Sequence, residues 1–215
     1  MNKTQFVVAV LSIFLMQSQT LSQSQDVPKF EVAAEFTTLE RDNFSGKRTE
    51  AGFGGRLTYN LNRVFSLESA GYFFPRRCNS CSNNGNVTEV VGGVKVGKRF
   101  ENWGIFAKAR PGFVSFSQGD VDVIRVPANP ALPIDFDIHR LNAFAADLGG
   151  VLEFYPSKRI VTRFDFGDTL IHFRRDDRQA IIFDPLTSVA HSVPFQVPSR
   201  TSQNFQFMAS VGFRF

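Results

Sequence analysis

The sequence predicts an all-β fold, namely an eight-stranded antiparallel up-and-down β-barrel that spans a membrane. Eight segments alternate apolar with polar or small residues, which is the period of a β-strand. No stretch after Met16 is apolar over the roughly 18–20 residues that a membrane helix requires. The connections alternate between short and long, as in barrels whose two rims face different compartments. Ten strands remain an alternative, because the segments near Val121 and Ile134 also alternate and could add a hairpin within the membrane.

Composition narrows the class of protein further. The chain has 215 residues, enough for one sizeable domain, and 43% of them are hydrophobic. Phenylalanine accounts for 25 residues and tryptophan for one, which is unusual for a soluble enzyme of this size. The 24 basic and 20 acidic residues are interspersed, and no Lys/Arg run exceeds two residues. We therefore expect no nucleic-acid partner.

The first 24 residues have the features of a secretory signal peptide. Lys3 supplies a positive charge, Phe6 to Met16 form an apolar stretch, and small polar residues follow. This stretch of about eleven residues is too short to cross a bilayer as a helix. Cleavage is expected after Ser22 or Ser24, and residues 25–215 are assigned to the β-barrel domain.

Each of the eight segments has one apolar face. The clearest case is the last, in which Phe205, Phe207, Phe213 and Phe215 share a face while polar or small residues occupy most of the other positions. The other seven segments cover residues 30–36, 51–59, 65–73, 90–96, 105–113, 144–154 and 160–170.

The opposite face of these segments collects charged residues. One charge, Asp168, falls in the apolar phase. The polar face carries Glu31, Glu35, Glu50, Arg56, Glu68, Glu89, Lys95, Lys108, Arg110, Asp147, Glu153, Arg163, Asp165 and Arg214.

Alternation alone does not decide which face is the inside. A soluble lipocalin-like carrier would turn its apolar face inward, whereas a membrane barrel turns it toward lipid. The order of the connections favours the membrane barrel. Residues 60–63, 98–102 and 156–159 form short turns, and residues 40–48, 75–86, 118–140 and 174–200 form long loops.

Aromatic residues near the strand ends are typical of the two membrane interfaces. At the short-turn rim these residues are Tyr59, Phe65, Trp103, Phe154, Tyr155 and Phe164. Toward the long-loop rim they are Phe36, Phe73, Phe74, Phe113, Phe144 and Phe173.

With its leader, its eight segments and a last strand that ends on Phe215, the chain resembles the OmpA/OmpX-type family of small outer-membrane β-barrels. The resemblance covers about residues 29–215. It implies the outer membrane of a double-membraned bacterium, with outer-membrane lipid around the barrel. It also implies that the barrel assembly machinery reads the last strand through Phe205, Phe207, Phe213 and Phe215. The surface loops carry no motif that extends the resemblance to a ligand.

The charged face predicts a largely filled lumen. An eight-stranded barrel is only just wide enough for its side chains to fill it, and an unpaired charge there is costly. We therefore expect the fourteen charges to pair as a structural plug. The alternative is a narrow porin-like channel for small solutes, lined by the same residues.

Cys78 and Cys81 form a CxxC pair in the second long loop. Exported cysteines are usually oxidised, so a local disulfide is the favoured interpretation. A redox pair would require a thioredoxin-like setting, and a metal site would require further ligands. No cofactor or metal is expected.

An outer-membrane hydrolase or acyltransferase is the less favoured alternative. It would use His172 with Asp168 on one strand, and Ser188 or Ser192 as the nucleophile. Asp168 lies in the lipid-facing phase, which disfavours such a dyad. The sequence therefore predicts a protein without enzymatic activity, with a structural, adhesion or ligand-binding role that its long surface loops would serve through a surface partner.

Overall fold

The computed structural model describes residues 27–43, 46–75, 85–125, 135–183 and 190–215. These residues contain strands and connections but no helix. In particular, they include no helix long and apolar enough to cross a membrane. The strands are β1 (Phe30–Asn43), β2 (Gly46–Asn60), β3 (Phe65–Phe74), β4 (Val87–Arg99), β5 (Trp103–Arg125), β6 (Asp135–Phe154), β7 (Ile160–Phe173), β8 (Asp176–Phe183), β9 (Ala190–Val197) and β10 (Arg200–Arg214).

Eight of these strands close into one antiparallel barrel, which confirms the expected fold. Their order around the barrel is β1, β10, β7, β6, β5, β4, β3, β2. The first and last strands complete the circle, since the backbone amides of Phe30 and Phe215 each donate to the carbonyl of the other at 2.9 Å. The remaining two strands, β8 and β9, form a separate hairpin between β7 and β10.

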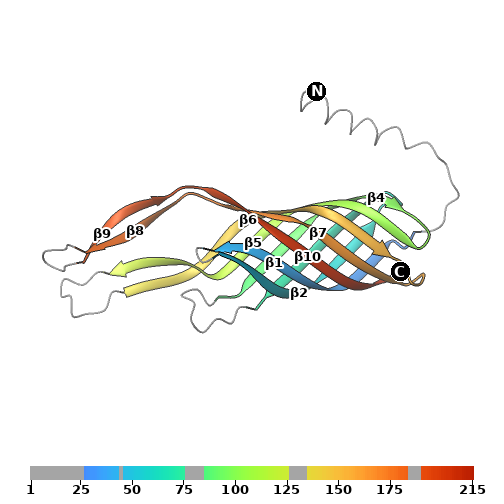
Figure 1. The fold of residues 1–215 in the computed structure, drawn as a ribbon, viewed down its shortest axis with the longest axis horizontal. Helices are drawn as coiled ribbons and strands as arrows, with labels where there is room; N and C mark the ends of the chain where they lie inside the picture. Colours follow the sequence, from blue (N-terminus) through green and yellow to red (C-terminus); the bar gives the residue numbers. More distant parts are fainter. Residues whose placement is uncertain (1–26, 44–45, 76–84, 126–134, 184–189) are drawn as a thin grey trace, which may run out of the picture.

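The barrel has two unlike ends (Figure 1). Short turns and the C-terminus lie at one end, which we call the short-turn end. The outer parts of β5 and β6 and the β8–β9 hairpin project from the other, the long-loop end (Figure 1). This asymmetry arises because residues 61–64, 100–102 and 155–159 form tight turns at the short-turn end, whereas β5 and β6 continue past the wall at the other end.

The alternation of residues produces two faces on every barrel strand. In β10 exposed and buried side chains alternate from Asn204 to Arg214. The outer surface is apolar: Phe53, Val90, Phe113 and Val211 are each at least 59% exposed. Charged and polar residues point inward instead, so a one-residue slip in register would bring charge to the apolar surface.

Glycine permits a close backbone approach between β6 and β7. Gly149 and Gly167 are paired across these strands, and both fall in the inward phase. A Cβ atom on Gly149 would lie 2.3 Å from the Phe166 carbonyl oxygen, and one on Gly167 would lie 2.1 Å from that of Leu148. Any larger residue at this pair would therefore force the two strands apart.

Three of the expected long loops are wrong in their bounds. Strands β1 and β2 stay paired as far as Asn43 and Gly46, so residues 40–48 belong mostly to strands. The 118–140 loop is largely the continuation of β5 and β6, which pair as far as Arg125 and Asp135 after a register shift. The 174–200 loop contains β8 and β9. In each case the alternating pattern simply continues past the barrel wall.

The alternative of a ten-stranded barrel, with a further hairpin in the wall, is wrong. The segments at Val121 and Ile138 extend β5 and β6 and pair with each other, so they add no strand to the wall. The chain has ten strands among its described residues because β8 and β9 form a hairpin outside the barrel.

Three of the aromatic residues expected at the membrane interfaces point inward. Phe74 is fully buried, Phe173 packs against the buried cluster of the lumen, and Tyr155 is 8% exposed. Phe74 and Phe173 continue the inward phase of β3 and β7 beyond the last charged residue, and Tyr155 continues that of β6 into the following turn. Their position shows that the inside of the barrel is not polar along its whole length.

Candidate functional site: the filled lumen and its two ends

The fourteen charged residues of the polar face lie together inside the barrel. Each of them is at most 8% exposed. Eight are acidic and six are basic, and they come from every strand of the barrel wall. Inside so narrow a barrel, these charges need partners, and the described contacts supply many of them.

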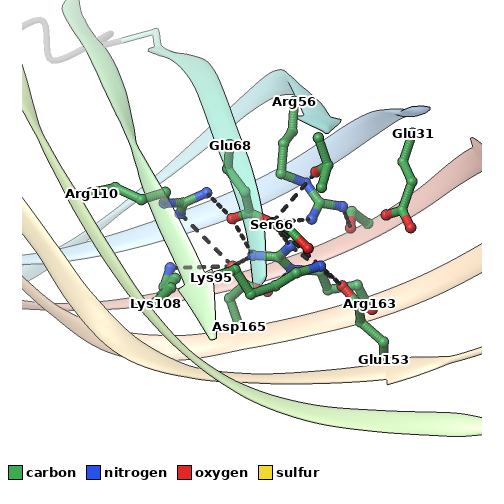
Figure 2. Close-up of polar contacts among 12 residues, drawn as sticks. Glu31, Arg56, Ser66, Glu68, Lys95, Lys108, Arg110, Glu153, Arg163 and Asp165 are labelled. Atoms are coloured by element: carbon green, nitrogen blue, oxygen red, sulfur yellow. Dashed lines mark hydrogen bonds and ion pairs between the residues drawn. The ribbon is translucent and has the colours of Figure 1, made fainter. Parts of the chain in front are cut away.

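Glu68 on β3 is the centre of this network (Figure 2). Its carboxylate lies 3.4 Å from Arg56 Nη1, 3.5 Å from Lys95 Nζ and 3.6 Å from Arg110 Nη1. Arg163 completes the set with two contacts, one of them at 3.1 Å between Nη2 and Oε2. One carboxylate thus contacts four cations, which offsets part of the cost of burying its charge.

Two contacts cross the whole lumen. Strand β3 with Glu68 and strand β7 with Arg163 lie four places apart in the ring of eight, that is, on opposite walls. Strands β4 and β10 are also opposite, and Gln206 Nε2 on β10 donates to Glu89 Oε2 on β4 at 3.1 Å. Side chains from facing walls therefore meet in the middle of the lumen.

Further ion pairs surround this centre. Lys108 Nζ lies 2.9 Å from Asp147 Oδ2 and 3.2 Å from Asp165 Oδ2. Arg110 contacts the same Asp147 through Nε at 2.9 Å and through Nη2. Arg163 Nη2 donates to Asp165 Oδ2 at 2.7 Å. Because each acid is shared between bases, removing one charge would affect several pairs.

An apolar layer occupies the lumen toward the long-loop end. It consists of buried side chains, and those of Leu39, Phe74, Val87 and Val114 have no exposed surface. The rings of Phe116 and Phe173, from β5 and β7, lie 5.9 Å apart across this layer. These side chains are shielded from solvent, so the lumen holds an apolar layer as well as ion pairs.

Arg99 organises the short-turn end of the lumen. Its Nε donates to the Tyr155 hydroxyl at 2.9 Å and its Nη2 to Asn60 Oδ1 at 3.2 Å. Nη2 also lies 3.6 Å from a carboxylate oxygen of both Glu31 and Glu153. The Tyr155 hydroxyl in turn donates to Glu153 Oε2 at 2.8 Å.

Tyr155 lies in the turn after β6 and stays protonated. Burial, with the adjacent Glu153 carboxylate as the second cause, raises its pKa above the ordinary tyrosine range. The phenol is therefore a neutral donor to Glu153 and a neutral acceptor for Arg99. Its ring also faces the Arg214 guanidinium at 4.3 Å from the ring centroid.

A pocket of about 550 Å³ opens at this end of the barrel. Four basic residues line it, together with one acidic residue, Glu101, and the Tyr155 ring. The four basic residues are Arg63, Arg99, Lys158 and Arg214.

The sequence did not identify several residues of the network. Arg99 follows Lys95 and Gly97 in the inward phase and ends β4, whereas the sequence predicts a short turn over residues 98–102. Tyr72 was not singled out, although its hydroxyl donates to Glu35 Oε2 at 2.5 Å. Gln206 is absent from the predicted network because that network contains charged residues only. Extending the inward phase of β4 to its last residue finds Arg99, and counting the uncharged polar residues of the inner face finds Tyr72 and Gln206.

The other candidate sites are placed differently. Cys78 and Cys81 lie outside the described residues, as does Ser188. Asp168 and His172 are both exposed on β7, and His172 Nδ1 lies 3.0 Å from the Thr201 hydroxyl. No group of three or more His, Cys, Asp or Glu residues in the described part of the chain is placed to hold a metal ion.

The four phenylalanines of the last strand all lie on its outer face. Phe205, Phe213 and Phe215 are roughly half exposed or more, and Phe207 is partly covered. The Phe207 ring stacks on that of Phe164 with centroids 6.4 Å apart, and Phe215 stacks on Phe30 at 6.0 Å.

Comparison with known proteins supports the fold. No protein-family model matches the chain, and no curated protein is significantly similar in sequence. The structure resembles Neisserial surface protein A (NspA) at 10% identity, covering 86% of this chain and 97% of that one, with a TM-score of 0.50. It also matches Ail, the attachment invasion locus protein of Yersinia pestis, at 13% identity, covering 87% of this chain and 99% of that one, with a TM-score of 0.47. OprG from Pseudomonas aeruginosa matches at 10% identity over 88% of this chain and 96% of its own, with a TM-score of 0.42.

Proposed function

We propose that this chain is an outer-membrane β-barrel of a double-membraned bacterium, with its lumen filled and its long-loop end at the cell surface. The observation that supports a membrane location is the reversal of the usual burial pattern. Large apolar side chains cover the outside of the barrel, while the charges are inside. In water such a surface would aggregate, whereas in lipid it is favourable.

The location can be tested directly. Cells that express the full chain are fractionated, and the detergent-extracted protein is run on an electrophoresis gel with and without boiling. We expect the protein in the outer-membrane fraction and a mobility that changes on boiling, because a closed barrel resists detergent until it is heated. A soluble product whose mobility does not change would contradict the proposal and favour a lipocalin-like carrier.

The role that this arrangement favours is binding at the cell surface, without enzymatic activity. The β8–β9 hairpin projects beyond the barrel (Figure 1) and carries exposed apolar residues, Ile182 at 55% and Phe195 at 53%. Exposed arginines flank it at Arg174, Arg175 and Arg200. An exposed strand edge with apolar and basic side chains suits a partner with an anionic surface.

Adhesion of cells to immobilised heparin, used as a polyanionic probe, tests this role. We expect the double variant Arg174→Gln/Arg175→Gln to lower cell retention several-fold, while Lys158→Gln at the opposite end of the barrel leaves it unchanged. Equal retention by all three proteins would argue against a binding role for the hairpin.

The filled lumen argues against the narrow channel. Opposite walls meet at Glu68 and Arg163, and the apolar layer separates this polar network from the long-loop end. In planar bilayers we expect no steady conductance from the purified protein. A steady current that falls in Lys108→Gln or Arg110→Gln would instead support the channel.

Two segments of the chain, residues 1–24 and the last strand, support a route of export and membrane assembly. We infer that residues 1–24 direct export and that the barrel assembly machinery recognises the last strand. The phenyl rings of the last strand point outward, where another protein can contact them before the barrel is inserted. This supports recognition by the barrel assembly machinery through Phe205, Phe207, Phe213 and Phe215.

A further inference from the structure

The pocket at the short-turn end has an unbalanced charge. Its lining has four basic residues against Glu101, and Lys158 and Glu101 are both exposed. The two acids behind the lining, Glu31 and Glu153, each lie near Arg99 Nη2, and Glu153 is shared with Lys95 and Arg163. The mouth of the barrel therefore carries more positive charge than its own carboxylates neutralise.

Arg99 keeps part of its guanidinium without a partner. Its side chain is 6% exposed, and its four hydrogen-bond and ion-pair contacts use Nε and Nη2. Nη1 is buried and has no hydrogen-bond acceptor within the described part of the chain. The same holds for Nε of Arg214, whose Nη2 donates to the carbonyl of Ser157 at 3.0 Å. Buried donors of this kind are costly unless something binds them.

The pocket is large enough for a small molecule rather than a single ion. A volume of about 550 Å³ falls within the range of ordinary ligand sites. The guanidinium fork matches the oxygens of phosphate, and a doubly charged group suits several cations better than a single carboxylate does.

The pocket also lies beside the outer surface of the barrel. Phe100 lines it, and the Phe100 ring stacks on that of Trp103 with centroids 4.3 Å apart. Trp103 is exposed on the outer face, where aromatic residues meet lipid headgroups in membrane barrels. Lys98 Nζ lies over the same Phe100 ring at 5.4 Å. A ligand can therefore approach either from the aqueous side or from the membrane interface.

We propose that this pocket is a phosphate-binding site, in which Arg99, Arg214 and Lys158 hold the oxyanion and Tyr155 forms an aromatic wall. The phosphate group belongs either to a free phosphorylated solute or to a phospholipid headgroup. The site is distinct from the hairpins at the other end of the barrel, so it does not depend on the proposed binding role of that end.

Pyrophosphate is the soluble probe, and Trp103 is the reporter because it is the only tryptophan of the chain. The protein is extracted from the membranes of expressing cells into a zwitterionic detergent, and its fluorescence is followed during titration. We expect a saturable change, weakened about threefold in Lys158→Gln, whose exposed cation contributes modestly. The change is expected to weaken about tenfold in Arg99→Lys, which loses the guanidinium fork.

The variants are chosen so that a loss of folding is not mistaken for a loss of binding. Arg99→Lys keeps a cation beside Glu31 and Glu153, and only protein that shows boiling-dependent mobility is titrated. Arg174→Gln removes an exposed arginine from the long-loop end and should bind pyrophosphate as the unaltered protein does. An equal loss in Arg174→Gln and Lys158→Gln would overturn the proposal, since it would indicate a general charge effect.

Bilayer nanodiscs separate the two sources of phosphate. If the ligand is a free solute, pyrophosphate binds equally in phosphatidylcholine discs with and without phosphatidylglycerol. If it is a headgroup, phosphatidylglycerol itself shifts the Trp103 emission and weakens pyrophosphate binding, and Lys158→Gln reduces both effects. Both results support a phosphate site. The absence of any saturable response in detergent and in both kinds of disc would refute it.

Discussion

The Glu68 carboxylate and the Arg163 guanidinium form an ion pair between opposite walls of the barrel, with Nη2 and Oε2 3.1 Å apart. The two residues are 95 positions apart in the chain, yet they meet because β3 and β7 face each other across the lumen. This contact ties the two halves of the barrel together and fills its centre.

Neutralising Glu68 should therefore destabilise the whole barrel. In Glu68→Gln four buried cations lose their shared carboxylate, and breaking such a buried pair costs roughly 3–5 kcal/mol. Urea unfolding in phospholipid vesicles, followed by the loss of boiling-dependent mobility, measures the free energy of unfolding. Glu101→Gln, at an exposed turn, is the control and should have no effect. Equal midpoints for the two variants would show that the network contributes little.

The apolar layer of the lumen can be tested with two adjacent residues. Phe74 is fully buried inside the barrel, whereas Phe73 points outward and packs on Phe53 with ring centroids 5.8 Å apart. We expect Phe74→Ala to lower the free energy of unfolding by about 3–5 kcal/mol because it leaves a cavity. Phe73→Ala should lower it clearly less, since lipid can fill the space. The urea unfolding assay measures both variants. A larger loss of unfolding free energy in Phe73→Ala than in Phe74→Ala would show that the core lies on the other face of β3.

An arginine on the outer face should distinguish lipid from water. Val94 is in the middle of β4 and points outward. If the barrel spans a bilayer, Val94→Arg costs about 2–4 kcal/mol in vesicles. Thr49→Arg, which places the same charge on an exposed residue near the long-loop end of β2, should be close to neutral. If the outer face met water, Val94→Arg would be as well tolerated as Thr49→Arg.

The disulfide between Cys78 and Cys81 stays a prediction. We expect a thiol-alkylating reagent to label neither cysteine in the unfolded, unreduced protein and both after reduction, as detected by mass spectrometry. In Cys78→Ser the remaining cysteine should react without reduction. Labelling of both residues in the unreduced protein would mean that the loop carries free thiols.

The leader can be tested on the same protein. N-terminal sequencing of the outer-membrane fraction should begin at Gln23 or Gln25, the residues that follow Ser22 and Ser24. A chain that still begins at Met1 would show that the first 24 residues are retained.

Much of the fold follows from the period-two pattern of the sequence alone. The segment around Glu31 and Glu35 and that around Phe213 and Arg214 show the inward and outward phases without any tertiary information, because strand side chains alternate strictly. Strand ends were less predictable. The pattern places Arg99 in a turn and Phe74 at the membrane interface, because it does not say where the barrel wall stops.

The sequence by itself predicted an antiparallel barrel wall and the charges that share its inner face, and it favoured eight strands over ten without excluding ten. The tertiary structure alone decided which of those charges meet. Glu68 and Arg163, or Glu89 and Gln206, are brought together by the closure of the ring, which sets the strand opposite each residue. Strand alternation is a local property of the backbone, whereas a contact across the lumen depends on the position of every strand between its two walls.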